Sequence, residues 1–431
     1  MNFERMRGLL LDQAIHGLLV SQEVDDGVVK QVGIAPDAES FTLPKSWKWI
    51  NLKELVTPTK QTIPAENFTY IDVSSIKNFQ LEGTKQLGPS NAPSRARKVV
   101  LAGMVLFATV RPYLKNICIA PNLSGSVIAS TAFATMSCSD YLTNRYLFYV
   151  LISDYFTELV KGKQRGISYP AISEKDFYAC HIPVPPVKEQ IRIVAKLEEA
   201  FAEIDRAEKA YEELQMLAGV LRGQILQEAI QGKLVPQSDA EPVVEQIGEV
   251  ASQIPFTIPE KWKWVQLKSV GQIVGGGTPK TSVADYWGDE FSWITPADLG
   301  KNSSKWIHSG AKSITRKGLD ESSAKLMPKG SVVYSSRAPI GHIAIADQEL
   351  CTNQGCKSFV PNTDLINTEW AYYTLIARTK DIQSRASGTT FKEISGKGMG
   401  ETWIALPPLG EQQRIITKIE DLLNHVDALR A

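Results

Sequence analysis

The chain has 431 residues, of which 43% are apolar, and its 47 basic and 47 acidic side chains give a formal net charge of zero. This length predicts two or three domains, each large enough to bury a core, and the composition is typical of a soluble globular protein. No apolar run reaches the roughly eighteen residues of a transmembrane helix, and the N-terminus lacks the apolar core of a signal peptide.

The cysteines are odd in number and scattered, which argues against a disulfide framework. Cys351 and Cys356 have no second pair or histidine cluster that would complete a zinc site. We therefore expect buried, reduced thiols, no metal or other cofactor, and a cytoplasmic location. The five cysteines are Cys118, Cys138, Cys180, Cys351 and Cys356.

Residues 1–42 are expected to contain a helix end, up to about residue 22, and then a polar linker. A first globular unit, residues 43–186, opens with Trp47 and Trp49, and a second, residues 258–408, opens with Trp262 and Trp264. The Trp-x-Trp alternation predicts a short strand with both rings on one face. Stacking of the rings on nucleic-acid bases is one interpretation, but core anchors are favoured.

The two units share further strand patterns. Phe68–Ile71 corresponds to Phe291–Ile294, and Gly103–Thr109 corresponds to Gly330–Ser336. An arginine follows each member of the second pair within two residues, Arg111 in the first unit and Arg337 in the second. Later, Thr352-Asn353-Gln354-Gly355 lies opposite Ser130-Thr131-Ala132-Phe133. Asn353 and Gln354 could pair with adenine edges, or equally could satisfy the backbone of their own loop.

Each unit continues with a predicted helix, over 141–160 and 368–383, and then a loop rich in glycine, hydroxyl and basic residues. Guanidinium groups, hydroxyls and an aromatic ring suit contacts with phosphates and base edges, so these loops are the first choice for DNA contact. The residues singled out are Lys163, Arg165, Ser168 and Tyr169 in the first unit, and Arg385, Thr389, Thr390 and Lys392 in the second.

Charge is distributed unevenly. The segments 83–139 and 299–319 contain basic residues and no acidic ones, whereas acids are concentrated in 187–257. This segregation predicts two basic surfaces, with a merely solvated face as the alternative for either segment. A glycine run, Gly275-Gly276-Gly277, is expected to form a tight turn that could approach a DNA backbone.

Residues 187–257 are expected to form a long spacer helix and a linker, because apolar residues recur every three or four positions from Pro185 to Gln237. Leu197 and Phe201 lie on this apolar stripe. Gly232 and Pro236 provide a stop signal near its end. A helix that is apolar on one side only needs a partner.

The partner is predicted from an internal repeat. Pro185–Ile193 recurs as Pro407–Ile415, 222 residues later, and the segment ending at Val235 matches the one ending at Val20, 215 residues earlier. Residues 409–431 and the N-terminal helix would therefore form the two halves of a second spacer, packed antiparallel against the first. We expect a circularly permuted two-fold repeat in which Met1 and Ala431 lie close together. The alternative is an accidental similarity of amphipathic helices.

The repeated Pro-Pro-x-x-Glu-Gln-x-Arg-Ile block, the Arg-Gly-x-Ile-Leu-x-x-Ala-Ile-x-Gly-x-Leu-Val segment and Thr352-Asn353-Gln354-Gly355 resemble the specificity subunit of Type I restriction–modification systems. The resemblance covers nearly the whole chain and implies an α+β protein with two target recognition domains separated by an antiparallel coiled coil. It also implies a non-catalytic subunit that binds a bipartite, asymmetric sequence in double-stranded DNA. The first unit departs from the pattern, because it has no clean Thr-Asn-Gln-Gly.

In that family two methylation subunits bind the specificity subunit, and restriction subunits join the complex. We expect the Glu-Gln-x-Arg segments and the outer faces of the helices to be available to these partners. The residues concerned are Glu189, Gln190, Arg192, Glu411, Gln412 and Arg414.

Two other functional classes compete with this interpretation. A scaffold whose domains bind proteins fits the acidic helix and the zero net charge, but not the paired basic segments. A single-chain hydrolase ranks third, because the five histidines are dispersed and no methyltransferase or nuclease motif is present.

Overall fold

The computed structural model describes residues 2–37, 40–166, 169–252, 254–388 and 392–429, and the structural statements below concern these residues. The chain divides into two compact units, Met1–Tyr211 and Glu212–Ala431, which are described separately. Helices and strands are mixed in both, as expected for an α+β protein. The predicted proximity of Met1 and Ala431 falls outside the described residues.

Unit 1 is closed at its base by its first and last strands, because β1 (Lys48–Asn51) pairs antiparallel with β12 (His181–Val184). The chain between β1 and β12 forms two four-stranded sheets, with the orders β6-β3-β10-β7 and β2-β11-β8-β9. Their bounds are β2 Val56–Pro58, β3 Phe68–Ile71, β6 Lys85–Leu87, β7 Ala96–Val99, β8 Val105–Ala108, β9 Ile117–Ile119, β10 Ser126–Ser130 and β11 Phe133–Cys138, beside a small β4 (Ile76–Lys77)–β5 (Gln80–Leu81) pair. The helices are α1 Phe3–Ile15, α2 Leu52–Leu55, α3 Asn144–Ile152, α4 Asp154–Lys161 and α5 Glu174–Tyr178.

Unit 2 repeats this plan with a different sheet inventory. Its closing pair is β13 (Lys263–Gln266) with β23 (Trp403–Leu406), again antiparallel. A five-stranded sheet has the order β14-β22-β19-β20-β17, and a four-stranded sheet has the order β15-β18-β16-β21. The bounds are β14 Gly271–Gly275, β15 Trp287–Gly288, β16 Phe291–Ile294, β17 Trp306–Ile307, β18 Lys312–Ile314, β19 Val332–Tyr334, β20 Ile343–Ala346, β21 Leu350–Thr352 and β22 Lys357–Pro361, with helices α7 Pro296–Lys301, α8 Arg316–Asp320, α9 Thr368–Ser384 and α10 Gly396–Gly400.

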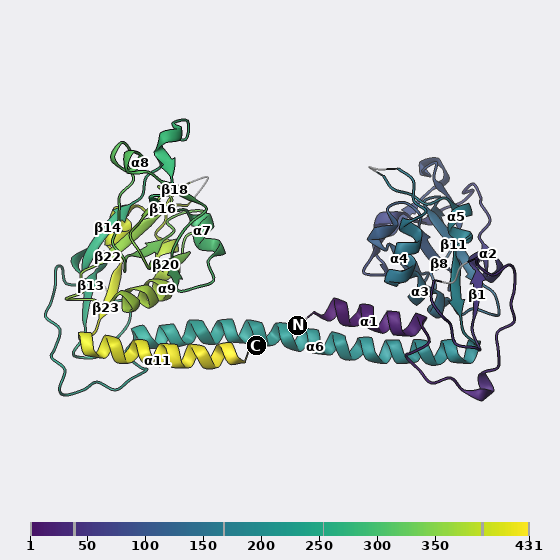
Figure 1. Cartoon of the computed structure of the whole chain (residues 1–431), viewed down its shortest axis with the longest axis horizontal. Helices are drawn as coiled ribbons and strands as arrows, with labels where there is room; N and C mark the ends of the chain where they lie inside the picture. The colour runs from purple at the N-terminus through teal and green to yellow at the C-terminus, as the bar shows by residue number, and fades with distance from the viewer. Residues whose placement is uncertain (1, 38–39, 167–168, 253, 389–391, 430–431) are drawn as a thin grey trace. The chain divides into compact units, whose positions relative to one another are not determined.

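The long helix α6 (Val187–Ile230, 44 residues) begins in unit 1 and ends in unit 2. In unit 1, α1 runs antiparallel to the first part of α6, with Phe3 against Tyr211 and Arg7 bonded to Asp205 at 2.6 Å. In unit 2, α11 (Leu409–Ala428) runs antiparallel to the last part, where Arg222 bonds to Asp427 (Figure 1). The antiparallel pairing predicted from the repeat is therefore present within each unit.

The helix α6 ends at Ile230, earlier than the Gln237 predicted from its periodicity. Gly232 has a φ of 72°, and the amide of Lys233 donates back to Glu228 O at 3.0 Å, which closes the helix with a left-handed residue. A Cβ at Gly232 would lie 2.3 Å from Pro259. Glycine is therefore required here both by the backbone conformation and by the close approach of the next segment.

The helix predicted over residues 141–160 is interrupted. Ser153 has an extended backbone, with a ψ of 154°, and its hydroxyl accepts a hydrogen bond from the amide of Phe156 at 3.2 Å. Serine is a strong N-cap because it satisfies an amide that has no partner inside the helix. The segment is therefore two helices, α3 and α4.

The tryptophans at the entrance of each unit are core residues, as predicted. Trp47, Trp49, Trp262 and Trp264 are 2–7% exposed. In unit 1, Trp47 shares a core with the apolar side of α1 and with Leu197 of α6, which is fully buried. Leu197, on the apolar stripe of the spacer, is therefore buried against the globular part of its own unit. Among the helices of the described residues, none combines the length and apolar character needed to cross a membrane.

Leu197→Ala should lower the free energy of unfolding by about 2–5 kcal/mol, because it leaves a cavity at a fully buried position. Urea denaturation followed by circular dichroism measures the change. Met216→Ala, on the same helix but 63% exposed, is the matched control and should change stability by less than about 0.5 kcal/mol. Equal effects of the two substitutions would contradict the packing described here.

Candidate nucleic-acid interface

In each unit three segments from distant parts of the chain meet at the ends of strands. In unit 2 the amide of Ser336 donates to Gly355 O at 2.8 Å, and the amide of Ile394 donates to Ser336 O at 3.1 Å. In unit 1 the amide of Thr109 donates to Ala132 O at 2.8 Å, and that of Ile172 donates to Thr109 O at 2.9 Å. We define the first loop cluster as the described residues of 109–111, 130–132 and 163–172, and the second as those of 336–338, 352–355 and 385–394.

Backbone pairing gives the correspondence between the two clusters. Val110 faces Ala171 in unit 1, and Arg337 faces Glu393 in unit 2, each through an antiparallel bridge. The counterpart of Arg337 is therefore Val110. Arg111 instead matches Ala338, and both have a positive φ, 49° and 52°. This agrees with the alignment of Gly103–Thr109 with Gly330–Ser336, in which an arginine follows one residue after the strand in unit 2 and two residues after it in unit 1.

The polar turn expected only in unit 2 is present in both clusters. Asn353 Oδ1 accepts the amide of Gly355 at 2.9 Å, and Ser130 Oγ accepts the amide of Ala132 at 3.2 Å. Asn353 thus serves its own backbone, which was the alternative considered from the sequence. The exposed residue between is Gln354 in unit 2 and Thr131 in unit 1. Sequence reasoning missed Thr131 as a candidate. The signal was a residue with a side-chain oxygen, Asn353 or Ser130, two residues before the amide that it binds, which is typical of such turns.

The glycine run supports this turn. The amide of Gly277 donates to Thr352 O at 2.9 Å, and a Cβ at Gly276 would lie 2.0 Å from Asn353 O. The hydroxyl of Thr278 bonds to Gln354. These glycines allow the backbone of their own unit to approach the turn, so their role is to position Gln354.

The first loop cluster presents its charged side chains to solvent. The Arg165 side chain is 87% exposed and lies 3.9 Å from Asp176. The guanidinium of Arg111 lies 4.5 Å from the centre of the Tyr169 ring, which is itself 69% exposed. Lys163 is exposed, whereas Ser168 falls outside the described residues. Arg165, Tyr169 and Lys163 are therefore free to meet a ligand.

In the second loop cluster Arg385 is bonded within the unit. Arg385 donates to Gly398 O and to Thr402 Oγ1, both at 2.8 Å, and pairs with Asp381 at 3.1 Å. In this structure the guanidinium of Arg385 is bonded within the unit, and its contact with DNA stays a prediction. Lys392 is exposed, whereas Thr389 and Thr390 lie outside the described residues.

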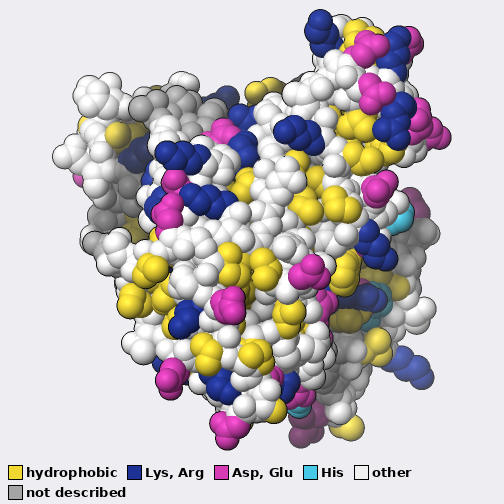
Figure 2. All heavy atoms as spheres, turned by 90° about the vertical axis from the view of Figure 1, so that its left-hand side faces the viewer, with side chains coloured by type: hydrophobic (Ala, Val, Ile, Leu, Met, Phe, Trp, Pro, Cys, Tyr) yellow, Lys and Arg dark blue, Asp and Glu magenta, His cyan; other side chains and the backbone are white. Residues whose placement is uncertain are grey.

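Several basic residues of the two acid-free segments are internal braces. Lys98 is 2% exposed and bonds to Glu174 at 2.6 Å, while Lys305 bonds to Glu369 at 2.7 Å and to Glu420. On the face drawn in Figure 2, Lys and Arg side chains are interspersed with Asp and Glu. Lys98 and Lys305 therefore brace their own units, and the two basic surfaces stay a prediction for the remaining bases of these segments.

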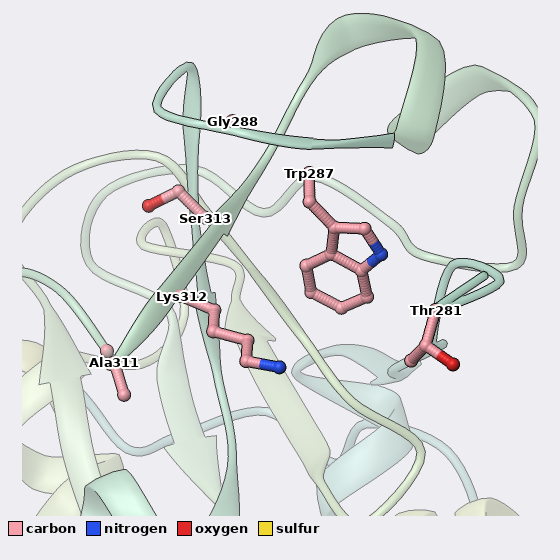
Figure 3. A pocket seen from close by; sticks show the side chains of 7 residues that line it. Thr281, Trp287, Gly288, Ala311, Lys312 and Ser313 are labelled. Carbon is pink, nitrogen blue, oxygen red and sulfur yellow. The ribbon is translucent and has the colours of Figure 1, made fainter. Parts of the chain in front are cut away.

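A hollow of about 520 Å³ in unit 2 is lined by an aromatic ring, an ammonium group and hydroxyls (Figure 3). Lys312 Nζ lies 5.1 Å from the centre of the Trp287 ring, and Thr281 and Ser313 complete the lining with Gly288, Gly310 and Ala311. Trp287 was not selected from the sequence, because only the fold brings it beside the basic segment. Such a surface suits a phosphate and its sugar.

The Glu-Gln-x-Arg segments predicted to face partner subunits are bonded inside the chain. Glu189, Gln190, Glu411 and Gln412 are fully buried. Gln190 accepts the amide of Thr143 at 2.8 Å and donates to Tyr141 O and Pro185 O, and Gln412 makes the corresponding bonds in unit 2. In this structure these four side chains face their own unit and not a partner, because the starts of α3 and α9 and the segments after α1 and α6 cover them.

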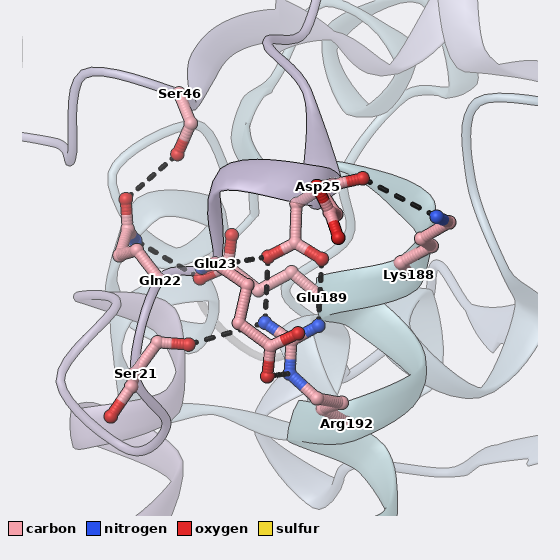
Figure 4. A network of polar contacts seen from close by, with 9 residues as sticks. Ser21, Gln22, Glu23, Asp25, Ser46, Lys188, Glu189 and Arg192 are labelled. Carbon is pink, nitrogen blue, oxygen red and sulfur yellow. Dashed lines mark hydrogen bonds and ion pairs between the residues drawn. The ribbon is translucent and has the colours of Figure 1, made fainter.

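The arginines of these segments hold the covering segment. Arg192 binds Asp26 through two hydrogen bonds of 2.6 and 2.7 Å, which lower the pKa of that carboxyl (Figure 4). Arg414 binds Glu241 in the same way at 2.8 Å. Arg192 and Arg414 are partly exposed, but their guanidinium groups are occupied within their own units.

Burial also shapes the ionisation of Glu189. Its carboxylate accepts a hydrogen bond from Gln22 Nε2 at 3.0 Å and lies against the Trp47 indole. Burial raises its pKa above the ordinary 4.5, and burial raises that of Glu411 likewise.

Comparison with known proteins places both units in one family of sequences. The family model for the Type I restriction modification DNA specificity domain matches residues 44–216 and again 259–430. The MjaIX specificity subunit of Methanocaldococcus jannaschii is 36% identical over 173 residues, which is 39% of this chain and 40% of that subunit. The HindI specificity subunit of Haemophilus influenzae is 22% identical over 373 residues, 75% of this chain and 81% of that one.

Solved structures give similar matches over most of the chain. The HsdS subunit from Thermoanaerobacter tengcongensis superposes with a TM-score of 0.63 at 30% identity, covering 91% of this chain and 92% of that one. A chain from a structure of a type I R-M system gives a TM-score of 0.73 at 30% identity, covering 90% and 93%.

Glu189→Gln should alter how stability depends on pH. A raised pKa contributes stability that is fully present below 4.5 and is lost as the pH rises through the value in the folded protein. The variant should therefore gain stability relative to the wild type as the pH rises above 4.5, measured by urea denaturation at several pH values. Glu199→Gln is the control: a hydrogen bond from Lys196 lowers the pKa of Glu199, so the trend should be opposite.

Arg385→Ala should lower the free energy of unfolding by about 1–3 kcal/mol, because it leaves Gly398 O and Thr402 without a charged donor. Lys163→Ala, at the corresponding exposed position of unit 1, should change it by less than about 0.5 kcal/mol. A variant of unchanged stability but reduced DNA affinity would return Arg385 to the interface.

Proposed function

Because this chain belongs to the family of Type I restriction modification DNA specificity domains, we propose that each unit binds one half of a bipartite, asymmetric DNA target through its loop cluster. One observation supports this most directly: the two clusters share a backbone framework but present different side chains. A common framework can dock on a duplex in the same way in both units, while different side chains select different base pairs.

The family match confirms the specificity-subunit resemblance and the DNA-recognition role expected from the sequence. Catalytic activities in such systems reside in other subunits, so the chain acts by choosing the DNA sequence. A scaffold that binds only proteins is not favoured, because both units match the DNA specificity model.

The exposed side chains suit two kinds of contact with DNA, one with the phosphate backbone and one with base edges. Arg165 and Lys163 supply exposed cations beside Tyr169, and Trp287 with Lys312 supplies a second polar and aromatic surface. Phosphate contacts position a protein on the duplex, whereas base-edge contacts select sequence. In this scheme the Trp287 hollow takes the DNA backbone, and Thr131 and Gln354, at the tips of matched turns, face base edges.

Partner subunits would bind the helices beyond the buried Glu-Gln-x-Arg segments. In unit 1 a groove of about 470 Å³ runs between α1 and α6, lined by Met6, Leu9 and Leu10 with Lys196 and Glu203 among others. Met6 and Leu9, which line this groove together, are 43% and 56% exposed. We propose that this groove receives one methylation subunit, and that the corresponding helix pair of unit 2 receives a second, to which restriction subunits add.

The decisive experiment is purification of the chain with its methylation subunits, followed by mapping of methylated sites in bulk DNA. A modified two-part motif with a fixed gap is expected. Complex formation without sequence-dependent methylation would contradict DNA selection by this chain, and failure to form the complex would favour the scaffold interpretation.

Arg165→Ala should weaken binding to the target duplex by about 1–3 kcal/mol if the guanidinium contacts a base. Fluorescence anisotropy at several salt concentrations gives both the affinity and the salt slope. Arg206→Ala, which removes another exposed arginine (70% exposed) from α6, is the control and should bind as the wild type does. Wild-type affinity of Arg165→Ala would remove this loop from the interface.

A further inference from the structure

The two loop clusters differ in charge at one backbone-matched bridge. In unit 1 the bridge pairs two apolar residues, Val110 and Ala171, and in unit 2 the matching bridge pairs Arg337 with Glu393. Both members of the charged pair have side chains that are 36% exposed, and Val110 and Ala171 are also partly exposed. At this bridge unit 1 therefore presents two small apolar side chains, beside the exposed Arg165 that also bridges to Ala171, whereas unit 2 presents a charged pair beside Ser387.

The charged pair is held in place without exhausting its hydrogen-bonding capacity. Lys357 Nζ bonds to Glu393 at 3.0 Å and to Gln354 O at 3.0 Å, which anchors the carboxylate beside the turn. Arg337 lies 3.6 Å from the other oxygen of that carboxylate. Within the described ranges, no hydrogen bond of the Arg337 guanidinium is found. Arg337 is thus oriented by charge while its donors remain free.

These surfaces suit different base pairs. A guanidinium can donate twice to the O6 and N7 atoms of guanine, and a carboxylate can accept from the amino group of cytosine, whereas small apolar side chains pack against the methyl group of thymine. We propose that Arg337 with Glu393 selects a G·C pair in the half-site bound by unit 2. Val110 with Ala171 selects an A·T pair, through its thymine methyl, at the matched position of the half-site bound by unit 1. This assignment rests on the proposed function.

The test exchanges one pair for the other. The full chain, purified with its methylation subunits, selects bound duplexes from a random-sequence library, and the wild type is compared with the double variant Arg337→Val/Glu393→Ala. The double variant leaves the net charge unchanged, so general attraction to phosphate is preserved. We expect the preference for G·C to fall roughly ten- to hundredfold at one position of one half-site, with the other half-site unchanged.

A conservative variant separates selection from folding. Arg337→Lys keeps the charge but loses the planar fork that binds guanine twice, so the preference should relax by about tenfold or more at the same position. If both variants select the wild-type motif at every position, the assignment is overturned while the proposed function stands. If the wild type itself selects no sequence, the proposed function and this assignment both fail.

Discussion

A buried glutamine fixes the globular part of each unit to a spacer helix, Gln190 on α6 and Gln412 on α11. Gln190 uses its amide oxygen and its amide nitrogen on three backbone groups, and Gln412 repeats the arrangement. An amide buried in this way is stabilising only when its partners are all present, since an unsatisfied polar group in the interior is costly. The start of α6 is therefore held against the start of α3, and the start of α11 against the start of α9. This fixes the globular part that carries each loop cluster relative to its spacer helix.

The loop clusters are built from backbone hydrogen bonds, which leave their side chains free to differ. The bonds from Thr109 and Ser336 are matched, yet the neighbouring residues are Val110 in one unit and Arg337 in the other. A framework that depends on main-chain groups tolerates such exchanges, because each residue other than proline supplies the same donor and acceptor. The two loop clusters can therefore present different side chains on the same backbone framework.

Periodicity and internal repetition were sufficient to predict the spacer helices, their antiparallel pairing and the tryptophan cores, because these depend on local patterns and on burial of one apolar face. The charged residues were predicted less well. Arg385 bonds to atoms of a later segment, and Glu189 is covered by the segment that follows α1. Such partners are brought close only by the tertiary fold. Sequence reasoning places a charged side chain at the surface when no partner lies near it in the sequence.

Each unit is closed by its own first and last strands, β1 with β12 and β13 with β23. The intervening chain leaves and returns at the same place, so insertions or losses within it need not disturb the attachment to the helix. The differing sheets of the two units, four and four strands in one and five and four in the other, show this tolerance. A duplicated gene built in this way can diversify its recognition surfaces rapidly while the parts that support them change slowly.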